Sequence, residues 1–362
     1  MSASIELFGP ELLPAVARFS ERYWNRPTTP QFMRWRYIDS RPFARTIVAL
    51  NDGECIATVS ALEKQYLVAG VPTRVLEVFD WHCLPEFRSA GAGLRVMRAM
   101  MRQPEPLLSI GGTPDVIATI PRMGWRKIGT ARVFELPMGG RRLSLWLRDR
   151  VRIPDGVTRK PLQAIAAVWF KPRNRRAPPS GQLVPVSGVG AQIVGLYRQS
   201  TVYGFVQEPR PALVRWMTTC EASNGAYLTL CFAVEGNLCG WVLARVYQRG
   251  GEVEAALLDV FAPKPDVATY EWMVREASAA LAGFEPWLIR ARATCPLLRA
   301  ALHRARFVEK SEGVPLHLWT TGQMSVPEPL HVTLNHTDEP LRPYPAPHET
   351  AAFLGRDEPS TE

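Results

Sequence analysis

Several features that would assign this chain of 362 residues to a protein class are missing from it. No apolar run approaches the ~18 residues that a bilayer-spanning helix needs, so no transmembrane segment is expected. The six cysteines form no Cys-x-x-Cys pair, and the six histidines show no metal-ligand spacing, which argues against a disulfide framework or a zinc site. The N-terminus lacks the basic start of a signal peptide. These absences predict a cytoplasmic protein that uses no metal.

The chain does have enough apolar sequence to build about two hydrophobic cores. Hydrophobic residues make up 46% and charged residues 21%, a composition typical of a folded protein with a water-exposed surface. The formal charge of +9 is uneven, because residues 139–179 hold eleven Lys or Arg and only two Asp. With its Leu and Trp residues, this segment fits an interdomain strap or, over 139–176, a peripheral contact with an anionic membrane. No nucleic-acid-binding motif accompanies the charge, so no nucleic acid partner is expected.

The most informative stretch is residues 84–102, where a strand-like run stops at Pro85 and a glycine-bearing turn opens a helix. Gly91 and Gly93 carry no Cβ, so backbone N–H groups can approach a bound group closely. The helix from about Leu94 adds free N–H donors and its positive dipole end, while Arg88 adds a formal charge. The sequence therefore predicts an anion site suited to a phosphate.

The spacing Arg88-x-x-Gly91-x-Gly93, preceded by Pro85-Glu86-Phe87, resembles the acyl-CoA pyrophosphate loop of the GNAT superfamily of N-acyltransferases. A Walker loop would need a Lys-Ser/Thr pair after its last glycine, and a dinucleotide fingerprint would need a third glycine. The flanking segments follow the order of this family: a strand at 71–84, a short strand at 107–114, a helix at 115–123 and a Gly-aromatic turn at Gly124-Trp125.

The resemblance implies an α/β (α+β) fold, in which a mixed, mostly antiparallel twisted sheet is flanked by helices. It also implies an acyl-CoA co-substrate, with acetyl-CoA as the first choice. The implied co-substrate contacts are Cys83, Leu84, Arg88, Ser89, Ala90, Gly91, Ala92 and Gly93. A glycine-containing helix entry without a ligand is the alternative interpretation of the same residues.

Two stretches about 180 residues apart resemble each other, which predicts a duplicated domain. Three segments in the first half are echoed in the same order in the second: 29–35 by 211–216, 54–59 by 237–242 and 75–80 by 256–261. The second copy has no glycine at the position of the loop, and its Pro263 and Pro265 lack the N–H donors that a phosphate needs. The second half is therefore expected to serve architecture or to shape the acceptor site.

The predicted organisation has four parts. They are a GNAT acyltransferase domain at 1–138, a basic linker or strap at 139–184, a degenerate GNAT-like domain at 185–325, and a mostly disordered tail at 326–362. The tail is predicted to be disordered because it is acidic, rich in proline and poor in large apolar residues beyond about Val332.

Acyl transfer to an amine requires a base for the amine, a donor that polarises the thioester carbonyl and a proton for the thiolate. The resemblance implies a carboxylate base on the strand before the loop, with Asp80 as the first choice and Glu77 as the second. Strand alternation would place Asp80 and His82 on one face and Glu77 on the other. The family often carries a tyrosine where this chain has Ile120, so the acid stays open. Cys83 is expected to pack rather than to act as a nucleophile.

The predicted function is transfer of an acyl group, most simply acetyl, from acyl-CoA to the primary amine of a small molecule. An amino sugar or a cell-envelope polysaccharide precursor is the candidate acceptor. The alternative is a non-catalytic acyl-CoA sensor or scaffold. Release of free CoA in the presence of amines distinguishes the two, because a sensor binds the thioester without cleaving it.

Overall fold

A computed structural model of the chain describes residues 3–25, 27–138, 181–186, 188–219, 225–322, 324–336 and 339–342. The predicted membrane-contact segment at 139–176 lies outside these residues. No helix in the described ranges is both long enough and apolar enough to cross a bilayer.

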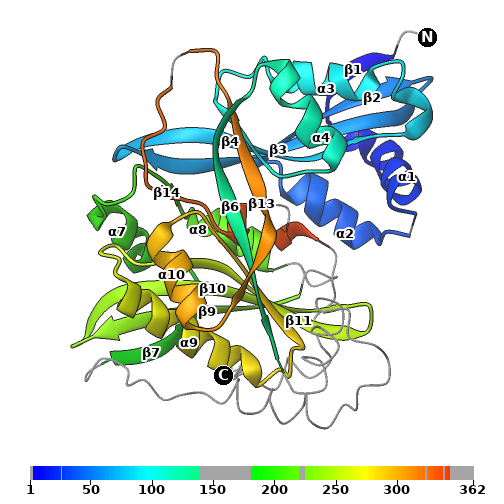
Figure 1. Ribbon diagram of the computed structural model, residues 1–362. Coiled ribbons are helices and arrows are strands. Elements are labelled where there is room, and N and C mark those ends of the chain that lie inside the picture. Colours follow the sequence, from blue (N-terminus) through cyan, green and yellow to red (C-terminus); the bar gives the residue numbers. More distant parts are fainter. Residues whose placement is uncertain are drawn as a thin grey trace, which may run out of the picture.

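The first half of the chain builds a sheet whose central strand β3 is contacted by α1 and by α3 (Figure 1). The two helices belong to different core clusters. The strands are β1 (Ser4–Leu7), β2 (Ala44–Asn51), β3 (Glu54–Val68), β4 (Val71–Cys83), β5 (Leu107–Ile110) and β6 (Arg126–Pro137). The helices are η1 (Pro10–Leu12), α1 (Leu13–Trp24), α2 (Pro30–Arg34), η2 (Trp35–Asp39), η3 (Pro85–Phe87), α3 (Ala92–Met100), α4 (Pro114–Thr119) and η4 (Pro121–Met123).

The second half repeats much of this order. Its strands are β7 (Gly181–Val186), β8 (Phe205–Glu208), β9 (Ala226–Val234), β10 (Asn237–Arg249), β11 (Glu252–Phe261), β12 (Leu288–Ala293), β13 (Val308–Trp319) and β14 (Leu330–His331). Its helices are α7 (Ala191–Gln199), α8 (Pro211–Thr218), α9 (Val267–Ala282), α10 (Pro296–Arg304), η5 (Leu334–His336) and η6 (Glu339–Leu341). Asp266 caps the N-terminus of α9, because its carboxylate accepts the Thr269 N–H at 2.8 Å.

One sheet runs through both halves, in the order β1-β2-β3-β4-β5-β13-β6-β12-β11-β10-β9-β7. Most neighbours are antiparallel, while β4–β5 and β11–β12 are parallel. The predicted mixed, mostly antiparallel sheet is therefore confirmed. We call β1–β5 with their helices the first lobe, and β7 and β9–β12 with their helices the second lobe.

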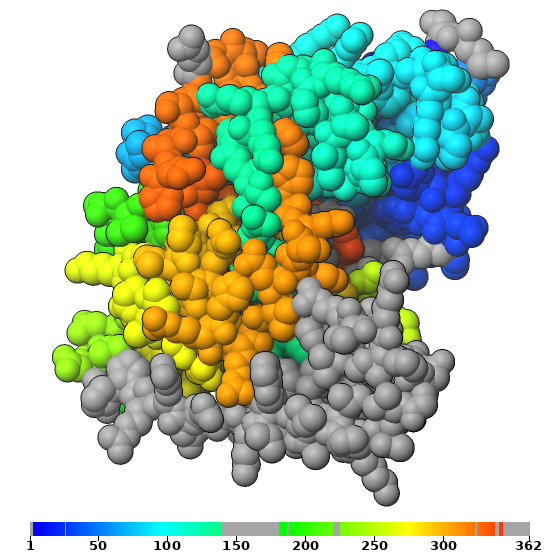
Figure 2. All heavy atoms as spheres, viewed as in Figure 1, coloured from blue at the N-terminus to red at the C-terminus, as the bar shows by residue number. Residues whose placement is uncertain are grey.

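The two lobes are joined by β6 and β13, which lie side by side between them (Figures 1 and 2). Strand β13 comes from the end of the chain, yet it pairs with β5 of the first lobe. Strand β6 comes from the first half, yet it pairs with β12 of the second lobe. Each half thus contributes one strand that pairs with the other lobe. The predicted domain boundaries at 138 and 185 do not divide the sheet, and they stay a prediction.

The sequence echoes fall on corresponding elements and meet at Trp35 and Trp216. The two indoles stack with ring centroids 4.9 Å apart. Each indole Nε1–H donates to the backbone carbonyl of the other residue, at 2.9 Å for Trp35 and 3.1 Å for Trp216. This reciprocal pair fixes α2 of the first lobe against α8 of the second.

Because Trp216 is buried in that contact, Trp216→Ala is expected to lower the free energy of unfolding by about 3–5 kcal/mol, as large-to-small core changes do. Trp216→Phe keeps an aromatic ring in the stack but leaves the Trp35 carbonyl without its donor, so a smaller loss of about 1–3 kcal/mol is expected. Urea unfolding measures both losses. Equal stability of the Ala variant and the wild type would contradict a structural role for the pair.

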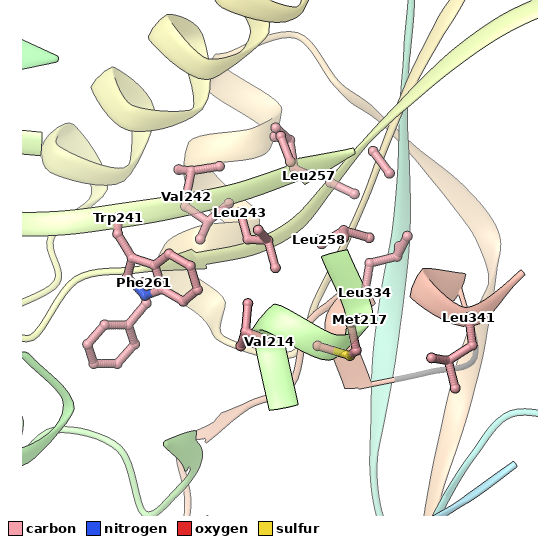
Figure 3. Packing of buried hydrophobic residues seen from close by; sticks show 14 of the residues in the cluster. Val214, Met217, Trp241, Val242, Leu243, Leu257, Leu258, Phe261, Leu334 and Leu341 are labelled. Carbon is pink, nitrogen blue, oxygen red and sulfur yellow. The ribbon is translucent and has the colours of Figure 1, made fainter. Parts of the chain in front are cut away.

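Within the tail predicted to be mostly disordered, residues 330–336 and 339–341 pack against the protein. Leu334 and Leu341 are buried in the same hydrophobic cluster as Met217 and Leu258 (Figure 3). Residues 330–336 are all buried, the polar ones as well as the apolar ones, so the protein encloses this segment.

This C-terminal segment contacts β11 and β12 where the two parallel strands separate. Val332 O accepts the Thr294 N–H at 3.1 Å, and the Thr333 hydroxyl donates to Asp259 Oδ1 at 3.1 Å. His331 Nε2 lies 3.4 Å from the same carboxylate oxygen. In the second lobe, the chain's own C-terminal segment therefore fills the place that corresponds to the opening between β4 and β5.

The ion pair between His331 and Asp259 makes the anchoring of this segment pH-dependent. Burial alone would lower the pKa of His331, but Asp259 and Cys295 outweigh it and raise the pKa to about 9. The stabilisation is complete below the ordinary value of 6.5 and is lost as pH rises through about 9. The stability difference between wild type and His331→Gln, from urea unfolding, should therefore shrink between about pH 6 and about pH 10. A difference that is constant over this range would contradict the ion pair.

Candidate active site

The predicted anion loop forms a turn that leads into α3. Gly91 has φ +72°, and a Cβ placed on it would meet no atom within 4 Å, so the left-handed backbone rather than crowding requires glycine here. A Cβ on Gly93 would lie 3.1 Å from Cys83 Cβ, so this glycine lets α3 approach β4 closely. Trp81 Nε1–H donates to Gly93 O at 2.7 Å and ties the helix to the strand. The N-terminus of α3 is thereby held beside the end of β4.

A cleft of about 1170 Å³ begins at this loop. Strands β4 and β5 pair only as far as Val78 and Ser109, and the cleft lies where they separate. The first lobe contributes residues 78–83 and 109–113 to its lining, and the second half contributes Arg292, His336, Arg342 and residues 310–315. Residues 310–312 of β13 bulge out between Glu309 and Gly313, which face Phe134 and Arg132 on β6. The cleft is therefore built by both halves of the chain.

The predicted co-substrate residues do not all face this cleft. Cys83, Arg88 and Gly93 line it, whereas Leu84 and Ala92 are buried in core clusters. The remaining three, Ser89, Ala90 and Gly91, form the turn between η3 and α3. Their contacts with a co-substrate stay predictions.

A β-bulge interrupts β4 beside the cleft. Phe79 faces Ser60 on β3, whereas His82 faces Thr58, so β4 has one extra residue between them. Asp80 occupies the bulge with φ +49°, and the Thr58 hydroxyl donates to its carbonyl at 3.1 Å. A bulge leaves a residue outside the ladder. Its backbone can therefore offer an N–H group to a thioester carbonyl in the cleft.

The bulge overturns the predicted separation of Glu77 from His82. Leu62 and Thr58 lie on one face of β3, and their partners on β4 are Glu77 and His82. Residues directly opposite one another in an antiparallel pair share a face of the sheet. The extra residue thus shifts the alternation, and Glu77 and His82 lie on the same face.

Asp80 is held in a buried ion pair. The Arg36 guanidinium donates to Asp80 Oδ2 from Nε at 2.9 Å and from Nη2 at 2.6 Å, and both side chains are 4% exposed. Burial alone would raise the pKa of Asp80, but Arg36 and His82 outweigh it and hold the pKa well below its usual range. A carboxylate of this kind is a weak proton acceptor. Sequence reasoning missed Arg36, because Arg34 and Arg41 stand close to it in the chain and nothing local distinguishes the one arginine that is buried.

His82 lies between Asp80 and the cleft. Its Nε2 is 3.5 Å from Asp80 Oδ1, and its ring stacks on Tyr23 with centroids 4.2 Å apart. The imidazole side chain is 25% exposed and lines the cleft together with Tyr23. The ring is thus fixed by a carboxylate on one side and an aromatic face on the other, and no hydrogen bond to Nδ1 is present among the residues that the structure describes.

Glu77 is engaged away from the cleft. Its carboxylate lies 2.7 Å from Lys64 Nζ and accepts a hydrogen bond from the Tyr66 hydroxyl. It does not line the cleft described above. Its role as the second choice of base stays a prediction that this geometry does not support.

Two further residues behave as packing groups. Burial raises the pKa of the Cys83 thiol, which disfavours the nucleophilic thiolate. Ile120 is fully buried in the cluster around α3 and is not among the residues that line the cleft. The proton for the leaving thiolate must therefore come from another group.

Comparisons with known proteins agree with this architecture. The family model described as "Acetyltransferase (GNAT) family" matches residues 11–105, which include β4 and the anion loop. Comparison with curated protein sequences gives no match.

Several solved structures share the fold over most of the chain. A probable N-acyltransferase from Enterococcus faecalis V583 is 12% identical with a TM-score of 0.59, over 88% of this chain and 72% of that one. Saccharomyces cerevisiae N-myristoyltransferase with bound myristoyl-CoA is 11% identical with a TM-score of 0.58, over 88% and 83%. A GCN5-related N-acetyltransferase from Anabaena variabilis is 11% identical with a TM-score of 0.57, over 87% and 72%. Residues 11–105 thus form a domain of the GNAT acetyltransferase family, and the two-lobed chain around it has the fold of GNAT N-acyltransferases.

Proposed function

We propose that this chain transfers an acyl group from acyl-CoA to a primary amine, with His82 as the base. One observation carries the proposal: β4 ends in an anion loop and, a few residues earlier, bulges to present Asp80 and His82 to the same cleft. The loop would hold the pyrophosphate of CoA through the N–H groups of α3 and through Arg88. The thioester would then lie between β4 and β5, beside the bulge.

The residues of the bulge account for the proton transfers. Asp80, fixed by Arg36, accepts a hydrogen bond from His82 Nε2–H and leaves Nδ1 to take one proton from the neutral amine as its nitrogen attacks. The amine nitrogen forms a bond to the thioester carbon while the backbone of the bulge stabilises the carbonyl oxygen. The C–S bond then breaks, and His82 returns its proton to the thiolate. Asp80 thus positions the base rather than acting as the base.

The co-substrate we propose is acetyl-CoA, and the acceptor is a small molecule. The cleft of about 1170 Å³ lies just above the roughly 300–1,000 Å³ of typical small-molecule sites, which supports binding of small molecules. An amino sugar or a cell-envelope precursor in the cytoplasm remains the candidate acceptor class. Arg292, His336, Arg342 and residues 310–315 of the second half line part of the cleft, which supports a contribution of this half to the proposed acceptor site.

The test is release of free CoA from acetyl-CoA in the presence of a panel of primary amines, followed with a thiol reagent. Amine-dependent release that disappears in His82→Gln supports the enzyme. Tight binding of acetyl-CoA without release by any amine favours the sensor or scaffold. The Asp80–His82 pair favours the enzyme, because a binding protein has no need of a fixed base.

A further inference from the structure

His336 brings a buried imidazole from the C-terminal segment to the cleft. His336 is the last residue of η5 and is only 2% exposed to solvent. It lines the cleft together with Asp80 and His82. No step of the acyl transfer described above uses it.

The hydrogen bonds of His336 fix which nitrogen carries the proton. Nδ1 accepts the Thr333 backbone N–H at 3.0 Å. The Thr333 hydroxyl also lies 3.1 Å from Nδ1, but it donates its proton to Asp259. Burial and the nearby Lys64 ammonium hold the pKa of His336 well below its usual range, so the ring is neutral. A neutral ring that accepts through Nδ1 carries its one proton on Nε2.

Within the described residues, this Nε2–H group has no hydrogen-bond partner. A buried donor left without a partner costs free energy, so an unpaired one in a cleft wall points to a ligand that supplies the acceptor. Because Nδ1 accepts from Thr333, Nε2 is the ring nitrogen left to donate on a residue that lines the cleft.

The position of η5 relates this donor to the amine substrate rather than to CoA. Lys64 Nζ, which pairs with Glu77, also donates to the Asn335 carbonyl at 2.8 Å. The segment therefore lies on the face of β3 and β4 to which Glu77 and His82 belong. Gly93 and α3 contact β4 through Trp81 and Cys83 instead. His336 thus lies on the His82 side of the sheet, away from the anion loop.

The second half also gives the cleft a positive lining. Arg292, Lys310 and Arg342 line it, against one lining carboxylate from the same half, Glu312, and Lys310 Nζ also lies 3.3 Å from Glu135 Oε1. An N–H donor in a cleft that also holds cationic side chains favours an oxygen acceptor with negative charge.

We propose that His336 Nε2–H binds an anionic oxygen on the acceptor, so that the acceptor is a primary amine that also carries a carboxylate-like group. The proposal rests on the proposed function and names the substrate class of its second site. His336 is then a specificity residue, supplied by the segment that closes the second lobe.

The test compares two amines of similar shape, β-alanine and isoamylamine, in which an isopropyl group replaces the carboxylate. Affinity for the CoA-bound protein is measured by calorimetry, which does not depend on turnover. Wild type should bind β-alanine at least about 10-fold more tightly than isoamylamine. This ratio corresponds to the contribution of one hydrogen bond to a charged group.

Two variants separate recognition from a structural role. In His336→Asn, the side-chain oxygen can replace Nδ1 and accept the Thr333 N–H, but nothing reaches the position of Nε2. In His336→Gln, the amide nitrogen can reach that position and donate. The β-alanine preference should fall several-fold in the Asn variant and be retained in the Gln variant. A structural role of Nδ1 alone would give the opposite order.

The proposal is overturned if wild type does not prefer β-alanine, or if the Asn variant keeps the full preference. Failure of the proposed function has a different signature, namely loss of acetyl-CoA binding at the Gly91 loop or absence of CoA release with every amine. The preference for β-alanine over isoamylamine is measured by calorimetry, separately from acetyl-CoA binding and from CoA release.

Discussion

Gly91→Asp is expected to abolish acyl-CoA binding. The new carboxylate would stand at the N-terminus of α3, where the pyrophosphate is proposed to lie, and would repel it while occupying the N–H donors. Isothermal titration with CoA and with acetyl-CoA measures the effect. No other loop among the cleft residues combines such donors with an arginine, so binding should fall below detection rather than weaken slightly.

A matched control removes the contribution of backbone strain. Gly70, in the turn between β3 and β4, has φ +78° and equally open surroundings, but it does not line the cleft. Gly70→Asp should therefore retain CoA affinity at a similar cost in stability. Asp266→Ala, at the start of the helix that corresponds to α3, should also retain it. Unchanged affinity in Gly91→Asp would remove the basis for the acyl-CoA site.

His82→Gln should lower turnover by about 10²–10⁴-fold, the range for loss of a general base, with acetyl-CoA affinity little changed. The glutamine keeps the approximate volume and a donor toward Asp80 but cannot accept a proton. Initial rates of CoA release at saturating acetyl-CoA measure the loss.

Variants of the two carboxylates decide between the possible bases. Asp80→Asn should reduce turnover because His82 loses its positioning partner, and Glu77→Gln should leave the chemical step intact because Glu77 faces Lys64 and Tyr66. Full activity in His82→Gln together with loss in Asp80→Asn would return the base to Asp80, the choice made from sequence. Loss in Glu77→Gln alone would move it to Glu77.

The sequence predicts the loop because its information is local. Glycine spacing, a preceding strand and a following helix occupy one short stretch, and each residue type has its own conformational reason. The sequence does not predict the bulge at Asp80, since an extra residue in a strand is defined by its partner strand and leaves no local composition signal. The wrong prediction that Glu77 and His82 lie on opposite faces follows directly, because the strand alternation was counted without the bulge.

Partners distant in the chain account for the other differences. The ion pair of Asp80 with Arg36 joins residues 44 positions apart, and it is the reason that we propose a positioning role for this carboxylate in place of the role of base. The exchange of β6 and β13 could not be anticipated, because both segments are amphipathic strands that fit either lobe. Residues 330–336 adopt a defined structure because they pack against β11 and β12 where these strands no longer pair. That packing site is formed by residues distant in the sequence.

The exchanged strands also impose an order on biosynthesis. The sheet of the first lobe is completed by β13, whose residues 308–319 leave the ribosome almost 200 residues after β5. Until then, β5 presents an open edge, and the wall of the cleft opposite β4 is missing. A nascent chain that ends before residue 308 therefore cannot form the complete cleft, however well its local helices and hairpins form. The site therefore forms only after β13 has been synthesised, and its contacts of long sequence separation predict slow folding.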